Sequence, residues 1–136
     1  IEIPPGGTFK AEKHMYEEIF YVVKGRGATV VWHEGSPKLT FEWEEDACFA
    51  IPLNANHRFV NASNSPALLL CGTTAPNIMN LVDNAHYVFN CPYNFTDRYA
   101  GTEDYFKPKD DLEPDPVRGL AMKRTNELNI EVFCGL

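Results

Sequence analysis

The chain has 136 residues, a length that suits one domain with a single buried core. Its formal net charge of −7, with Lys and Arg scattered along the sequence, argues against a nucleic-acid surface, which usually shows a basic patch. No apolar run approaches the ~20 residues of a membrane span, so we predict neither a nucleic-acid nor a membrane partner.

Short runs of β-branched and aromatic residues between turn signals predict strands. Glu18–Lys24 and Ala28–Trp32 are predicted to form a hairpin around Gly25-Arg26-Gly27. Further strands are predicted at Leu39–Trp43, Ala47–Ile51, His57–Asn61 and Pro66–Cys71. About six short strands at regular spacing favour an all-β barrel or sandwich.

The sequence changes character after Thr74. Pro76–Val82 has apolar residues at helical spacing and is predicted to be a short helix. His86–Phe95 is aromatic and irregular, and Gly101–Pro116 is acidic and Pro-rich, as in a long loop or linker. We therefore divide the chain into a barrel core, residues 1–75, and an irregular, aromatic and Pro-rich extension or linker, residues 76–136.

None of the four cysteines lies in a C-x-x-C pair, so a zinc ribbon or thioredoxin motif is not expected. Cys48 and Cys71 lie in apolar strand-like runs and are predicted to be small core residues. A reduced, cytoplasmic protein is the simpler interpretation.

Ligand-type residues gather in the segment before the first predicted strand pair. In an extended chain Glu12, His14, Tyr16 and Glu18 share one face, because successive strand side chains alternate. Buried charges need partners, and a metal cation is a common partner for carboxylates and imidazoles. His14 and Glu18, together with His57, suffice for a two-His, one-carboxylate set.

The residue order in this segment resembles the first cupin motif. It reads Gly6, five residues, Glu12, one residue, His14, three residues, Glu18, six residues and Gly25. The family usually has His where Glu12 stands.

A second cupin-like motif follows: Asp46, five residues, Pro52, then His57, three residues and Asn61. The family usually has Gly at the position of Asp46, and often at that of Asn54. The resemblance covers about residues 6–61 and implies a cupin double-stranded β-helix, or jelly-roll barrel, of the metallocupin type with an irregular C-terminal extension.

The resemblance implies a divalent transition metal held by Glu12, His14, Glu18 and His57. We favour iron(II), with manganese, nickel and zinc as alternatives, since two carboxylates suit harder ions. Glu12 could instead be an outer hydrogen-bond acceptor, a general base or a solvated carboxylate at the barrel rim. Tyr16 is a second candidate catalytic residue and a substrate contact, with plain packing as its alternative.

Other residues have simpler interpretations. Phe20 and Phe59 are candidates for the walls of a substrate pocket. Asn61 is predicted to be a hydrogen-bonding residue at a strand end, and His33, beside Glu34-Gly35, is predicted to lie at the surface.

The resemblance favours a metal-dependent dioxygenase-type oxidoreductase acting on a small oxygenated organic substrate. The alternatives are a metal-dependent isomerase or lyase and a non-catalytic, small-ligand-binding cupin. We predict a homodimer, or pairing with a second cupin domain as in two-domain bicupins. Because a cupin barrel usually has strands before its first motif, we expect a second chain or upstream residues to supply them.

Overall fold

The structure is a computed structural model that describes residues 1–106, 112–115, 119–122 and 133–134. Its strands are β1 (Glu2–Ile3), β2 (Glu18–Lys24), β3 (Arg26–Trp32), β4 (Leu39–Glu44), β5 (Ala47–Ala50), β6 (Asn56–Val60), β7 (Ala67–Thr73), β8 (Leu112–Asp115), β9 (Gly119–Met122) and β10 (Phe133–Cys134). The helices are α1 (Ala75–Val82) and α2 (Ala85–Asn90). Neither of these helices is long and apolar enough to cross a membrane.

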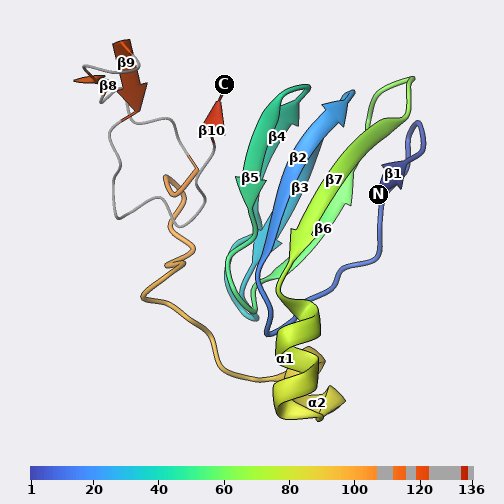
Figure 1. Cartoon of the computed structure of the whole chain (residues 1–136), viewed down its shortest axis with the longest axis vertical. Helices are drawn as coiled ribbons and strands as arrows, with labels where there is room; N and C mark the ends of the chain where they lie inside the picture. Colours follow the sequence, from blue (N-terminus) through green and yellow to red (C-terminus); the bar gives the residue numbers. More distant parts are fainter. Residues whose placement is uncertain (107–111, 116–118, 123–132, 135–136) are drawn as a thin grey trace.

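Two antiparallel sheets form the body of the domain (Figure 1). The larger has the order β1-β7-β2-β5-β10 and the smaller the order β4-β3-β6, while β8 and β9 pair separately. In Figure 1, β2 and β7 lie in front of β3 and β6. This arrangement confirms the predicted all-β, jelly-roll class.

The core forms where the two sheets face each other. Strand alternation directs Phe20 and Val22 of β2 inward, and Val31 of β3 and Phe49 of β5 are also buried. Phe20 and Phe49 stack with ring centroids 5.4 Å apart. That pair lies within the larger sheet, whereas Phe20 also contacts Phe59 of β6 in the smaller sheet, with ring centroids 5.0 Å apart, so aromatic contacts join the two sheets.

The predicted hairpin around Gly25 is wrong, although both of its strands exist. β2 pairs with β5 and β7, whereas β3 pairs with β4 and β6, so the chain crosses from one sheet to the other at this turn. Gly25 has φ 89°, and a Cβ there would lie 2.9 Å from the Cα of Ala67. The crossing therefore needs glycine for both its conformation and its close approach to β7.

Two positions where the cupin motif usually has glycine are left-handed here as well. Asp46 has φ 69° and Asn54 has φ 56°. Asp and Asn tolerate this conformation better than other non-glycine residues. The departures from the motif at these positions therefore preserve the backbone path.

In the extension, the structure confirms one predicted helix and adds a second helix and a strand. The predicted helix at Pro76–Val82 is confirmed as α1, but part of His86–Phe95 is helical as α2. The side chain of Asn84 accepts a hydrogen bond from the backbone N–H of Tyr87, a helix-capping signal that the sequence contained. Within the predicted loop Gly101–Pro116, residues 112–115 form β8, and 107–111 and 116 lie outside the described residues.

His33 is buried, so its predicted surface position is wrong. Its Nε2 lies 3.0 Å from the backbone oxygen of Tyr99, which is itself buried and donates its hydroxyl to the backbone oxygen of Val31 at 3.3 Å. Residues after position 75 thus complete the barrel core. The division at residue 75 remains a prediction.

Asn61 connects the N-terminus to the turn after β6, in agreement with its predicted role. Its Nδ2 donates to the backbone oxygens of Ile3, at 3.0 Å, and Ser65, at 2.8 Å, and its Oδ1 accepts from Ser63. The side chain is fully buried. Loss of these bonds would remove a donor from the backbone oxygens of Ile3, which is buried, and Ser65.

We expect Asn61→Ala to lower the free energy of unfolding by about 1–3 kcal/mol, the usual cost of an unsatisfied buried group. Urea unfolding followed by circular dichroism measures this change. Asn64→Ala, at an exposed position nearby, is the matched control and should change stability little. Equal stability of the two variants would contradict the structural role of Asn61.

Candidate metal centre

The segment that leads into β2 is extended only in part. Glu12 forms an isolated antiparallel bridge with His57, with N···O distances of 2.9 and 2.8 Å. Beyond it the backbone turns: Met15 N–H donates to the oxygen of Val88 in α2, and Asn54 N–H donates to the oxygen of His14. The predicted single face from Glu12 to Glu18 is therefore interrupted, because α2 and the loop before β6 take these backbone bonds.

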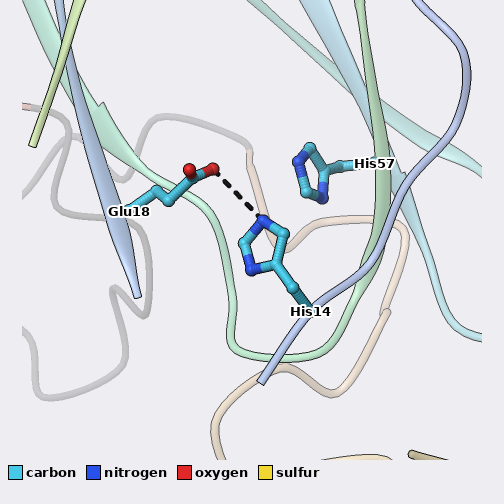
Figure 2. A group of neighbouring side chains, drawn as sticks. All are labelled: His14, Glu18 and His57. Atoms are coloured by element: carbon cyan, nitrogen blue, oxygen red, sulfur yellow. Dashed lines mark ion pairs between the residues drawn. The ribbon is translucent and has the colours of Figure 1, made fainter. Parts of the chain in front are cut away.

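His14, Glu18 and His57 nevertheless converge (Figure 2). One ligand atom of each lies within 4.8 Å of the others, and His14 Nε2 is 3.2 Å from Glu18 Oε2. His57 is fully buried, His14 is 4% exposed and the Glu18 side chain is 14% exposed. Three protein ligands would leave coordination positions of a bound ion open for water or substrate.

The hydrogen bonds of the two imidazoles assign their tautomers. His14 Nδ1 lies 2.9 Å from the backbone oxygen of Tyr16, and His57 Nδ1 lies 3.2 Å from that of Ala55. A carbonyl oxygen only accepts, so each Nδ1 is the donor and each neutral ring directs the lone pair of Nε2 into the cluster.

Both Nε2 atoms are buried and have no hydrogen-bond partner in the part of the chain that the structure describes. The lone pair of His14 Nε2 then faces a carboxylate oxygen of Glu18, an arrangement of two acceptors that a cation between them would satisfy. The 3.2 Å contact lacks hydrogen-bond geometry, which agrees with this assignment. The donor set therefore fits a divalent metal.

Burial and neighbouring groups shift the pKa values in the direction that metal binding requires. Burial lowers the pKa of His57 to about 4, partly offset by its hydrogen bond to Ala55. Burial alone would raise the pKa of Glu18, but the neighbouring imidazoles of His14 and His57 lower it overall. Near neutral pH the cluster thus presents a neutral imidazole from His57 and an ionised carboxylate from Glu18.

Glu12 and Tyr16 lie beside the cluster of three. Glu12 Oε1 is 3.7 Å from His57 Nε2, but its side chain is 58% exposed. The ring of Tyr16 stacks on that of His14, with centroids 3.7 Å apart. Burial and the carboxylates of Glu18 and Glu12 raise the pKa of Tyr16 to about 12, so its hydroxyl stays protonated. Their roles as metal ligand, base or proton donor remain predictions.

Phe20 and Phe59 lie deeper than a pocket wall requires. Both are buried in the core cluster, with ring centroids 5.0 Å apart, and the Phe59 ring is 5.9 Å from that of His57. Phe59 therefore packs against the imidazole of His57, and Phe20 packs against Phe59. Direct contact with substrate remains a prediction.

Two neighbours of the site were not identified from the sequence. Cys71, half-buried instead of fully in the core, places its Sγ 3.7 Å from Glu18 Oε1, and burial raises its pKa to about 11. The ring of Phe89 in α2 lies 6.3 Å from that of Tyr16. Cys71 shares strand parity with the buried Leu69, but its nearness to Glu18 depends on the pairing of β2 with β7, which no sequence signal gives.

The sequence matches the family model of the cupin domain over residues 1–73, so the chain belongs to this family. The predicted resemblance is confirmed. The comparison with curated proteins gave no match.

Solved structures with the same fold are distant in sequence. The coconut allergen cocosin is 20% identical, with a TM-score of 0.52 over 60% of this chain and 24% of its own. The Drosophila melanogaster CENP-C cupin domain is 12% identical, with a TM-score of 0.50 over 54% of this chain and 53% of its own. BH2720 from Bacillus halodurans is 24% identical, with a TM-score of 0.48 over 52% of this chain and 55% of its own. The chain thus spans about half or less of these structures. At these identities cocosin and the CENP-C cupin domain show the fold alone.

Proposed function

We propose that the protein is a metal-dependent oxidoreductase of the dioxygenase type that acts on a small oxygenated organic substrate. The observation that supports this most is the pair of buried, unpartnered Nε2 atoms of His14 and His57 beside the Glu18 carboxylate. Two histidines and one carboxylate with open positions are typical of non-haem iron(II) oxygenases.

His14, His57 and Glu18 would hold the ion, with iron(II) favoured and manganese, nickel or zinc as alternatives. Glu12 would join them only if its exposed carboxylate turned inward. A bound divalent ion supplies Lewis acidity toward substrate oxygens, and iron(II) adds redox chemistry with dioxygen.

The chain itself supplies orientation and proton transfer. The backbone oxygens of Tyr16 and Ala55 fix the rings of His14 and His57. The Tyr16 hydroxyl, protonated at neutral pH, can donate a hydrogen bond to a substrate oxygen. The exposed carboxylate of Glu12 is open to solvent and can accept a proton from a substrate hydroxyl.

The same groups support an isomerase or lyase as the second candidate. Glu12 and Tyr16 lie close enough for the Glu12 charge to raise the pKa of Tyr16, and a proton acceptor beside a proton donor suits such reactions. A non-catalytic, ligand-binding cupin is the third candidate. In each case we propose a small-molecule ligand and a reducing, cytoplasmic setting.

Oxygen consumption tests the first candidate. Protein loaded with iron(II) is mixed with phenolic, diketone and hydroxy-acid compounds, and we expect oxygen uptake with one of these classes.

Glu12→Gln should lower turnover about 10²-fold at unchanged metal content, the usual contribution of a general base. Glu17→Gln, at a neighbouring exposed carboxylate, is the control. Turnover without oxygen in the zinc-loaded protein would favour the isomerase or lyase, and no turnover would favour the binding protein.

A further inference from the structure

Cys71 lies on the inner face of the larger sheet, beside the metal centre. Ala67 and Leu69 of β7 are buried, and alternation continues this inward series to Cys71, which pairs with the buried Phe20 of β2. Glu18 precedes Phe20 by two positions along the same strand, so its side chain lies on the same face. The register of β7 on β2 therefore brings a thiol next to a carboxylate of the metal centre.

The thiol of Cys71 has two acceptors within reach. Its Sγ lies 3.7 Å from Glu18 Oε1 and 3.7 Å from the backbone oxygen of Gly72. An ionised carboxylate and a carbonyl oxygen only accept hydrogen bonds, so the thiol is the donor in each contact. The thiol has one hydrogen, and the ionised carboxylate is the stronger acceptor of the two. The S–H bond is therefore directed at Glu18 Oε1.

The two oxygens of Glu18 face different neighbours. Oε2 lies 3.2 Å from His14 Nε2, whereas Oε1 accepts from Cys71. The Nε2 atoms of His14 and His57 are both buried, and neither makes a hydrogen bond to any residue that the structure describes. One carboxylate oxygen thus lies where the unpartnered nitrogens converge, while the thiol occupies the other oxygen.

We propose that Cys71 is a positioning residue for the metal centre, and that its thiol holds Glu18 Oε1 so that Oε2 is presented to the ion. The proposal rests on the metal-dependent function proposed above and adds a residue that acts through a ligand. A carboxylate with one oxygen held in this way has less rotational freedom to lose when the ion binds. It would also bind through one oxygen, which leaves more coordination positions open to substrate.

Other roles for Cys71 make different predictions. A thiolate ligand would bond to the ion directly, and a small core residue would only fill space. Serine in its place could still donate to Glu18 Oε1 without being a thiolate, whereas valine would fill the space without a donor. Cys48 provides the matched control, because it is also half-buried but pairs with the exposed Tyr21 on the outer face of the same sheet.

Titration of the metal-free 136-residue chain with cobalt(II), followed by isothermal calorimetry, tests the proposal. We expect Cys71→Val to weaken cobalt(II) binding about 10–100-fold, the usual cost of losing a hydrogen bond to a metal ligand. Cys71→Ser should bind cobalt(II) nearly as tightly as the wild type, because its hydroxyl replaces the thiol as donor. Cys48→Val should leave the affinity for cobalt(II) unchanged.

Circular dichroism shows whether each variant folds, and Cys71→Ala replaces Cys71→Val if the latter does not. Equal affinity of the wild type and Cys71→Val, or equal weakening in Cys71→Val and Cys71→Ser, would overturn the proposal. So would a near-ultraviolet sulfur-to-cobalt charge-transfer band that Cys71→Ser removes, since it would make Cys71 a ligand. A wild type that binds no cobalt(II) would overturn it together with the metal centre. The expected affinities without any oxygen uptake would support it and contradict only the proposed activity.

Discussion

His57→Ala is expected to abolish stoichiometric binding of a divalent metal. His57 is fully buried, its Nε2 makes no hydrogen bond within the described residues, and it comes from β6, on the opposite side of the cluster from Glu18. Without it only His14 and Glu18 remain of the three. Changes to residues that merely support a ligand weaken metal binding 10–100-fold, so we expect loss of a ligand to cost at least about 100-fold.

Metal analysis by inductively coupled plasma mass spectrometry, with titration of the metal-free protein, measures this loss. The matched control is His33→Ala, which also removes a buried imidazole but lies outside the cluster. Its stability should fall through the lost contact with Tyr99, while its metal content stays at the wild-type level. Equal metal content in wild type and His57→Ala, both folded, would show that the three side chains do not form the site.

The second large effect is a loss of stability in the metal-free protein as the pH falls from about 6.5 to about 4. Burial lowers the pKa of His57 to about 4, from its ordinary 6.5. In this window the unfolded chain binds a proton at His57 that the folded protein does not, so stability rises with pH. The full difference is about 3 kcal/mol, complete above pH 6.5 and lost below pH 4.

Urea unfolding in the presence of a chelator, between about pH 7 and pH 5, isolates this contribution. Glu18 acts at lower pH: its pKa is lowered from 4.5, so its stabilising effect is lost only as the pH falls through and below that value. His57→Gln, close in size to histidine but without a titrating ring, should flatten the dependence. A slope that persists in this variant would assign the effect to another group.

The resemblance of the two motifs to those of the cupin family was enough to predict the barrel and the meeting of His14, Glu18 and His57. The spacing of motif residues reflects the lengths of the strands and turns between them, and these lengths are local properties of the sequence. Because turn signals are also local, the hairpin predicted at Gly25 is wrong. A turn signal shows that the chain reverses, but not which sheet the next strand enters.

The sequence could not predict contacts that depend on packing between distant segments. His33 looked exposed because its neighbours suit a turn, yet Tyr99 covers it. Cys71 lies beside Glu18 only because β7 pairs with β2 in one register. The exposed Leu70 looks like an ordinary core residue until the packing of the sheets shows which side of β7 is covered.

The sequence by itself determined the family, the strand pattern and the residues able to bind a metal, because local alternation and turn residues encode them. The tertiary structure alone decided the tautomers of His14 and His57, the depth of burial that shifts the pKa of His57, and which face of β2 remains open. These depend on neighbours far apart in the chain. Burial, orientation of lone pairs and exposure are properties of the assembled sheets.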